Sequence, residues 1–399
     1  FMMRAMGELL LSNLNYKSFM DFAEDILGHW AGFFIGWTYW FCWIVTGTAD
    51  IIAISGYIQF WFPDVSPWVP VFGLVALLVA LNMVSVKLFG ELEFWFASIK
   101  IIAILAIILV SAVMVASMFV SPSGYEAKIS NLWIHDGFFP KGLFGFFAGF
   151  QIALFAFVGI ELVGTTAAET ENPAVNLPRA INAIPIRIIF FYVFALVAIM
   201  IITPWNSIDP GQSPFVTVFV LAGIPAAAGI VNFVVLTSAA SSANSGIYST
   251  SRMLFGLAQV AVAPKSFGKL SSKAVPLNGL FFSCLCLLLG AAMLIVMPTV
   301  MAAFTVMTTI SSILFIFVWS LILFSYIKYR KKFPQRHEAS KYKTPGGMPM
   351  IWATQIFFIF VLVLLTFEED TRQVLMLTPL WFVVIGAGYM VSRKHRISK

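Results

Sequence analysis

The stretch that decides the fold reads MAAFTVMTTISSILFIFVWSLILFSYI and runs from Met301 to Ile327. It contains no charged residue, and it is longer than the ~20 apolar residues that an α-helix needs to cross a bilayer. Apolar runs of this length are not half-buried strands, because such strands alternate apolar and polar residues. The stretch therefore predicts a transmembrane helix.

The composition of the whole chain agrees with this prediction. Of its 399 residues, 60% are hydrophobic and 11% are charged, whereas soluble domains carry ~25% charged residues. A single core in a water-soluble fold has no room for 41 Phe, 12 Trp and 17 Met. The composition excludes a secreted domain, a nucleic-acid binder and an ordinary cytosolic enzyme, and it predicts an all-α, polytopic membrane protein.

Ten stretches, counting this one, meet or approach the spanning length. A tight turn at 297–299 separates two of them, and 214–225 is predicted to be a re-entrant or surface segment. The ten spans are 29–62, 69–86, 93–119, 143–167, 184–204, 226–257, 275–297, 301–327, 350–367 and 374–392.

The chain opens with Phe1-Met2-Met3, and a partial apolar stretch ends near Leu11. We expect this opening to be the end of a span whose beginning is missing, so that the sequence is truncated at its N-terminus. Arg4 and Glu8 are four residues apart, which predicts a pair on one helix face.

The net charge of +6 comes from an uneven distribution of basic residues between alternate connections. Cytoplasmic connections are enriched in Lys and Arg, which gives the orientation and places the C-terminus in the cytoplasm. We predict a multi-pass protein of the inner membrane. The rich side holds Lys17, Lys87, Arg179, Arg187, Lys265, Lys269, Lys273, 328–343 and 393–399, and the poor side holds Lys128, Lys141 and Arg372.

The sequence shows no pattern for enzyme chemistry. Its three cysteines, Cys42, Cys284 and Cys286, lie in apolar runs and fit neither a disulfide framework nor a zinc site. We find no nucleophile–base arrangement, no metal-ligand spacing and no phosphate-binding loop. We therefore predict no enzyme activity, no cofactor and no metal.

Ionisable residues inside spans are costly and mark functional sites by default. The spans contain Asp50, Lys100, Glu161 and Arg252. Asp50 is interpreted as a counter-charge for a substrate ammonium or as a proton site, or else as an acid bonded to Thr46 or Thr48. Lys100 is interpreted as a desolvated amine that takes up and releases a proton, or else as a side chain that reaches the interface.

The segment FAFVGIE, Phe155 to Glu161, places a glycine and an acid inside an apolar span. Glycine permits a helix to unwind, and unwound backbone in a membrane is tolerated only where it is buried or lines a cavity. Exposed carbonyls and half-helix ends then bind a charged ligand. We predict a helix break within 156–161 beside a cavity; the alternative is a helix with one packing glycine.

Small and hydroxyl residues are concentrated in 238–249, where Ser242, Gly246 and Ser249 share one helix face. This face lines a cavity or packs closely against another helix. Thr308, Ser311 and Ser312 form a similar polar face with the same two interpretations.

Several motifs together resemble the bacterial amino-acid transporter branch of the amino-acid/polyamine/organocation superfamily. They extend over essentially the whole chain. The motifs are RAMGELL at 4–10, TAD at 48–50, FWFASIK at 94–100, FAFVGIE at 155–161, AETENP at 168–173, LPRAI at 177–181, SSANSGIYSTSR at 241–252 and LLTFEEDTR at 364–372.

The resemblance implies a single transporter domain over 1–399 with two inverted repeats of five helices and two further C-terminal helices. The first repeat continues to residue 119, the second covers 143–327, and the last two helices lie in 350–392. The first helix and most of the second are missing by this comparison. The half of the binding site that the first helix supplies is therefore not assigned.

The resemblance also implies roles for individual residues. Phe155 matches an aromatic gate, Ala156 and Val158 border the substrate with backbone carbonyls, and Gly159 matches the break. Ser242 and Gly246 match the cavity side of their helix. Glu161 matches an acid that holds the broken helix and responds to protons. Lys100 matches an amine that replaces the sodium ion of sodium-coupled relatives.

These roles imply proton-coupled uptake of small neutral amino acids, of the D-serine, D-alanine and glycine class, by alternating access. The expected partners are an amino acid, protons and lipids, with no nucleic acid; the sequence leaves the oligomeric state open. The alternatives are a permease for an aromatic or branched amino acid, a receptor or channel on the same scaffold, and a membrane-embedded enzyme.

Overall fold

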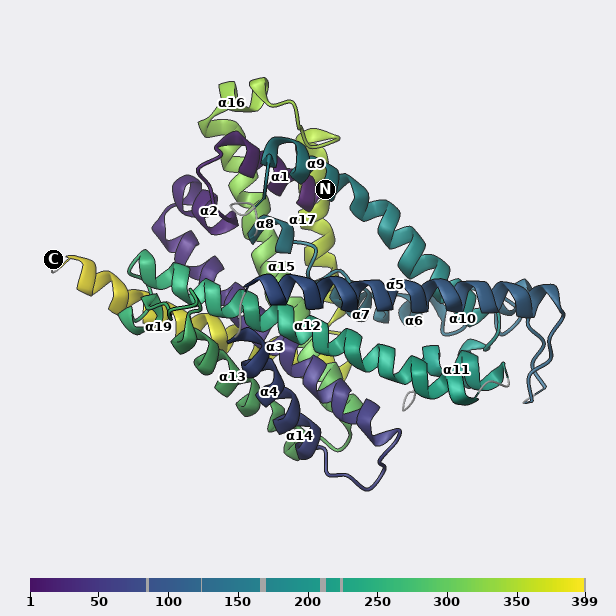
Figure 1. The fold of residues 1–399 in the computed structure, drawn as a ribbon. Helices are drawn as coiled ribbons and strands as arrows, with labels where there is room; N and C mark the ends of the chain where they lie inside the picture. The colour runs from purple at the N-terminus through teal and green to yellow at the C-terminus, as the bar shows by residue number, and fades with distance from the viewer. Residues whose placement is uncertain (84–85, 123, 166–169, 209–212, 223–224, 398–399) are drawn as a thin grey trace.

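The computed structural model describes residues 1–83, 86–122, 124–165, 170–208, 213–222 and 225–397, and these residues form helices joined by turns and loops (Figure 1). Strand-like pairing in these residues is limited to an isolated bridge between Val120 and Glu126. Part of one family motif, Ala168-Glu169, lies outside the described residues.

The first half of the chain forms helices α1 (Met2–Ser12), α2 (Phe19–Leu27), α3 (His29–Gln59), α4 (Trp68–Asn82), α5 (Val86–Ala116), η1 (Ile129–Leu132), α6 (Gly142–Ala148), α7 (Phe150–Phe155), α8 (Leu162–Thr165), α9 (Pro173–Ile188), η3 (Ile189–Val193) and α10 (Phe194–Met200). The second half forms η4 (Trp205–Ser207), α11 (Pro214–Leu221), α12 (Pro225–Gln259), η5 (Lys265–Gly268), α13 (Leu277–Ala291), α14 (Met293–Val296), α15 (Val300–Lys332), α16 (Pro334–Ala339), α17 (Gly347–Leu364), α18 (Glu369–Leu377) and α19 (Pro379–Ile397).

Each of the ten predicted spans coincides with helical structure. By length and composition, eight helical segments of the described chain are able to cross a membrane, and Trp68–Asn82 and Gly142–Phe155 are shorter apolar helices. The predicted start at residue 184 is wrong, because α9 begins at Pro173 and continues through Pro185 into the π-turn η3. The segment 214–225 contains a separate short helix, α11.

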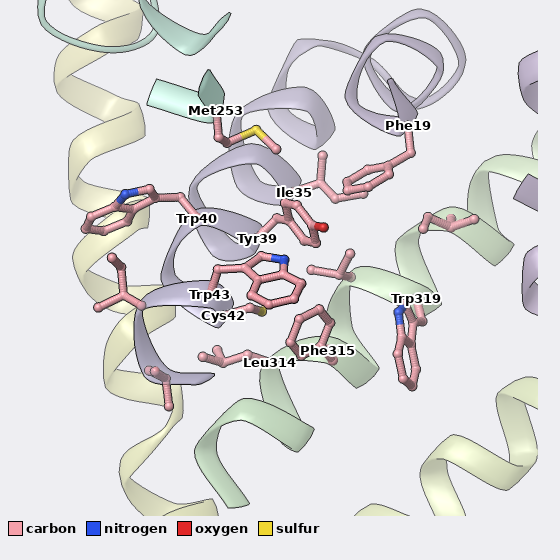
Figure 2. Close-up of a cluster of buried hydrophobic side chains, with 14 of the residues drawn as sticks. Phe19, Ile35, Tyr39, Trp40, Cys42, Trp43, Met253, Leu314, Phe315 and Trp319 are labelled. Carbon is pink, nitrogen blue, oxygen red and sulfur yellow. The ribbon is translucent and has the colours of Figure 1, made fainter. Parts of the chain in front are cut away.

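Helix α3 is the centre of the fold and packs most extensively against α12 and α15. It is apolar on all sides, which is typical of a buried helix. Its aromatic residues Tyr39 and Trp43 meet Phe315 of α15 edge-on, with ring centroids 6.0 and 6.1 Å apart (Figure 2). These bulky side chains set the spacing between the two long helices.

A second, smaller apolar cluster joins α5 to α10, α11 and α12, through residues such as Ile107, Ala198 and Val218. The opposite side of α5 carries exposed apolar residues, of which Ile102 and Leu109 are each 66% exposed. Large exposed apolar side chains are expected on a surface that faces lipid tails.

Arg4 and Glu8 do not form the predicted pair, because each side chain bonds to the connection that follows α15. Arg4 donates to Asn182 Oδ1 at 2.7 Å and to the Lys343 carbonyl at 2.6 Å, and its guanidinium lies 3.8 Å from the centre of the Tyr342 ring. The connection folds over α1 and offers more partners than one helix face does.

Glu8 is fully buried and accepts several hydrogen bonds. Tyr326 donates at 2.8 Å and the Thr344 backbone N–H at 2.9 Å, both to Oε2, while His337 Nδ1 lies 2.5 Å from Oε1. This one carboxyl group therefore joins α1, α15, α16 and the segment that leads to α17.

We expect Glu8→Ala to destabilise the protein by ~3–5 kcal/mol, because removing one member of a buried hydrogen-bonded network leaves its partners unsatisfied. Thermal unfolding of the purified protein in detergent measures the effect. The matched control is Glu338→Ala, since Glu338 is exposed on α16. Equal stability of the two variants would contradict the role assigned to Glu8.

Candidate functional site

The helix that begins at α6 is interrupted after Phe155, and regular structure resumes at Leu162 in α8. Within the interruption, Phe157 N–H donates to the Leu154 carbonyl and Val158 N–H donates to the Phe155 carbonyl, each at 3.0 Å. These bonds reach back three residues instead of the four of an α-helix. The predicted loss of helical bonding within 156–161 is confirmed, and the cavity beside it stays a prediction.

Gly159 is the residue that permits the break. Its φ of +99° lies in a region that residues with a Cβ rarely adopt. A helix with one packing glycine would keep φ negative at this position. The alternative interpretation of Gly159 is therefore wrong.

Glu161 stabilises the break from inside. Its carboxyl group is fully buried, accepts the Gly159 backbone N–H at 3.1 Å, and accepts the Tyr39 hydroxyl of α3 at 3.2 Å. An unwound N–H inside a membrane needs such a partner, because no water replaces the missing helical bond. The geometry fits the acid that the resemblance expects to hold a broken helix.

Tyr192 is a residue that the sequence analysis missed. It lies in the π-turn η3, and its hydroxyl donates to the Ala156 carbonyl at 2.6 Å. A carbonyl oxygen has two lone pairs, so the Ala156 oxygen keeps one acceptor position. The π-turn itself is a signal of function, but it is visible only in the structure.

Phe155, at the last turn before the break, packs edge-on against Phe304 of α15, with ring centroids 6.2 Å apart. Val158 packs against the main core. The predicted residues Phe155, Ala156, Val158, Gly159 and Glu161 are thus brought together at one break, with partners from α3, α15 and η3.

The indole of Trp43 lies between this break and α12. A Cβ atom added at Gly246 would lie 2.8 Å from Trp43 Cε3, and one added at Gly159 would lie 3.7 Å from Trp43 Cη2. Figure 2 shows the Trp43 ring held between Tyr39 and Phe315. The sequence analysis missed Trp43, because one aromatic residue among many in an apolar span carries no signal of its own.

Lys100 forms a second polar group with α12. Its amine donates to Ser241 Oγ at 3.0 Å, and the Ser241 hydroxyl donates to Glu93 Oε1 at 2.6 Å. The bond to Ser241 favours the interpretation of Lys100 as a desolvated amine over the one in which its side chain reaches the interface. Glu93 is the third residue that the sequence analysis missed, since it is the first residue of the predicted span 93–119 and carries no signal of its own there.

Asp50 of α3 completes this polar group. It lies against Ser242 and near the charge of Lys100, and its Oδ2 atom is buried without a hydrogen-bond partner. Thr46 and Thr48 donate instead to the carbonyls of Cys42 and Ile44. The alternative in which these threonines bond Asp50 is therefore wrong.

The polar face of α15 bonds to other helices. Ser311 lies 2.7 Å from Thr46 of α3, and Gln151 of α7 donates to Thr308 at 3.3 Å. This confirms the interpretation of interhelical bonding for these hydroxyls.

The helix break and the polar group around Lys100 both lie against α3. Trp43 and Asp50 are seven residues apart on α3, so they share one face and are separated by about 10 Å along its axis. A helix break with a free acceptor position is suited to a charged solute, and a half-buried amine near two carboxylates is suited to a mobile proton. Within the described ranges, no three His, Cys, Asp or Glu side chains gather as metal ligands do.

Apolar spanning helices, an interrupted helix and buried charges together define a multi-pass membrane transporter. The amino acid permease family model matches residues 1–399. The chain belongs to this family, and its function is amino-acid transport, not catalysis.

Individual relatives agree with this family. The D-serine/D-alanine/glycine transporter of Escherichia coli (strain K12) is 64% identical over 399 residues, which cover 100% of this chain and 85% of that protein. The amino-acid permease AapA of Bacillus subtilis (strain 168) is 50% identical over 401 residues, which cover 100% of this chain and 86% of that protein. The probable threonine/serine transporter YbxG of the same organism is 38% identical over 393 residues, which cover 98% of this chain and 84% of that protein.

We expect Gly246→Ala to destabilise the protein by ~1–3 kcal/mol and to slow transport, because the added methyl group overlaps an indole that cannot move away from Phe315 and Tyr39. Thermal unfolding and amino-acid uptake measure the two effects. The control is Gly56→Ala in α3, where the nearest atom to an added Cβ is 3.6 Å away. Wild-type behaviour of Gly246→Ala would show that Trp43 does not limit this space.

Proposed function

We propose that the protein carries small neutral amino acids of the D-serine, D-alanine and glycine class into the cell, driven by protons. The observation that carries this proposal is the helix break at Gly159 in a chain 64% identical to a transporter named for these three substrates. The packing of Trp43 against Gly246 supports it, because a large ring beside the break leaves little space for a bulky substrate side chain.

The break provides the chemistry that a zwitterion requires. An amino acid carries an ammonium and a carboxylate, and both lose their water shells in a dry site. The carbonyls of Ala156 and Val158 are proposed to accept from the ammonium, while Glu161 and Tyr192 hold the unwound backbone in place. Phe155 is proposed to close over the substrate, and Ser242 and Gly246 to border it from α12.

Lys100, with Glu161 as a second candidate, is proposed to couple transport to protons. A proton that crosses with the substrate adds ~2.3 kcal/mol per 100 mV of membrane potential. The charge of Lys100 holds α5 to α12 through Ser241. Loss of a proton weakens this tie and favours the rocking of one helix bundle against the other that alternating access requires.

The orientation is proposed from the charges and from the contacts at the helix ends. Arg4 bonds to Asn182 and Lys343, and Lys332 bonds to Asp25, so basic connections gather at one end of the bundle. Lys141 lies over Trp205 at the other end. We assign the first end and the C-terminus to the cytoplasm, in the inner membrane. The two five-helix repeats, with 1–119 in the first and 143–327 in the second, and the C-terminal pair in 350–392 belong to the same proposal.

Counterflow in proteoliposomes tests the substrate. The proteoliposomes contain the protein and are loaded with unlabelled glycine. We expect them to take up labelled glycine, D-alanine and D-serine much faster than labelled phenylalanine or leucine, because the large substrates overlap Trp43. Faster counterflow with phenylalanine or leucine would favour the second candidate, a permease for bulky neutral amino acids.

Lys100→Met tests the coupling, because it keeps most of the side-chain stem and removes the charge. With an imposed gradient of about one pH unit, wild type should accumulate glycine about tenfold if one proton moves per substrate, since a tenfold ratio corresponds to ~1.4 kcal/mol. We expect Lys100→Met to show no accumulation but to retain counterflow. The control is Lys269→Met, on an exposed connection. Wild-type accumulation by Lys100→Met would show that the proton moves elsewhere, with Glu161 or Asp50 next to be tested.

A further inference from the structure

Three side chains from two helices form a continuous hydrogen-bonded chain beside the main core. The Lys100 amine donates to Ser241, and Ser241 donates to Glu93 at 2.6 Å. Helices α5 and α12, which supply these residues, run alongside each other (Figure 1). The Ser241 hydroxyl is fully buried and connects the ammonium to the carboxylate.

The charges of this group do not balance. Lys100 is positive, whereas Glu93 and Asp50 are both negative, so the ionised group carries a net charge of −1. Each carboxylate also has one oxygen, Glu93 Oε2 and Asp50 Oδ2, that is buried without a hydrogen-bond partner. A carboxylate that is charged and has an unpaired oxygen is costly to keep out of water, and a proton on Glu93 lowers this cost.

The described neighbours of this group are mainly neutral. Helix α12 adds Ser242 beside Asp50, and α3 adds Tyr57, which is close enough to sense the Asp50 charge. Asn82 of α4 bonds to Asn244 of α12 at 2.8 Å. Among the described residues, these neighbours add no charge that offsets the second carboxylate.

We propose that Glu93, Ser241 and Lys100 form one proton-binding unit, in which Glu93 accepts the transported proton from Lys100 through Ser241. This inference rests on the proposed proton coupling and names the groups that carry it out. Glu93 is absent from the roles that the family resemblance implies, and it is assigned from its contacts alone.

The transfer is balanced and needs no other reactant. The Ser241 O–H bond breaks as its proton passes to Glu93 Oε1, and an N–H bond of Lys100 breaks as its proton passes to the Ser241 oxygen. Ser241 ends as a hydroxyl group, Lys100 as a neutral amine and Glu93 as a neutral carboxyl group. One ion pair is thereby replaced by two neutral groups, which removes the electrostatic attraction between α5 and α12.

The geometry also gives the transfer a direction. Glu93 lies seven residues before Lys100, so its backbone is about 10 Å nearer the start of α5. In the proposed orientation, α5 begins at the cytoplasmic side. A proton on Glu93 is therefore held by a residue nearer the cytoplasmic end of α5 than Lys100 is, which is the direction that uptake requires.

A purely structural role for Glu93 predicts different results for the variants at this site. Glu93→Gln keeps the side-chain length and an oxygen that accepts from Ser241, but it cannot take up a proton. Ser241→Thr keeps the hydroxyl, whereas Ser241→Ala removes it. If the contact only held α5 to α12, Glu93→Gln and Ser241→Thr would both behave as wild type.

The test uses the complete protein in proteoliposomes, with labelled glycine and a pH-sensitive dye that reports proton uptake. We expect Glu93→Gln and Ser241→Ala to retain glycine counterflow but to lose proton uptake and pH-driven accumulation. Glu93→Asp and Ser241→Thr should retain both, and Glu91→Gln, an exposed neighbour, serves as the matched control.

A wild-type ratio of protons to glycine in Glu93→Gln would overturn the inference. Loss of counterflow in Glu93→Gln would also overturn it, since a proton acceptor is not needed for exchange. Glycine transport by wild type without proton movement is a separate result: it would refute the proposed coupling itself, and with it the basis of this inference.

Discussion

The constraint on which the structure depends is that a bilayer interior offers no water to unpaired backbone groups. A helix interrupted in the middle of a membrane is therefore stable only if the protein supplies the missing hydrogen bonds. Glu161 supplies an acceptor for the Gly159 N–H, and Tyr192 supplies a donor for the Ala156 carbonyl. The same two side chains leave acceptor capacity on the unwound segment, and in the proposed function this capacity binds the substrate ammonium.

Most of the fold could be predicted from the sequence, because apolar length is a local property. The spans and the break within 156–161 follow from composition, glycine and one buried acid in a continuous stretch of chain. The start of α9 could not be predicted, since Pro178 and Pro185 normally end helices, whereas this helix tolerates both.

The candidate site was less predictable, because its partners come from distant parts of the sequence. Tyr192, Trp43 and Glu93 have no local pattern that distinguishes them from other residues in apolar helices. Arg4 and Glu8 show the opposite error: their spacing on α1 predicts a pair, but the connection after α15 offers better partners. Spacing identifies which residues are able to meet, and only the packing of the chain decides which of them do.

The network around Glu8 has a consequence for motion. It joins α1 to α15, to α16 and to Thr344, and Arg4 adds Asn182 of α9 to the same assembly. Separating α15, α16 or Thr344 from α1 would break hydrogen bonds to the buried Glu8 carboxyl group, so we expect these segments to stay together as one rigid unit. Flexing during a transport cycle is then displaced away from this end, toward the unwound residues 156–161, where turns of three residues resist bending less than a continuous helix does.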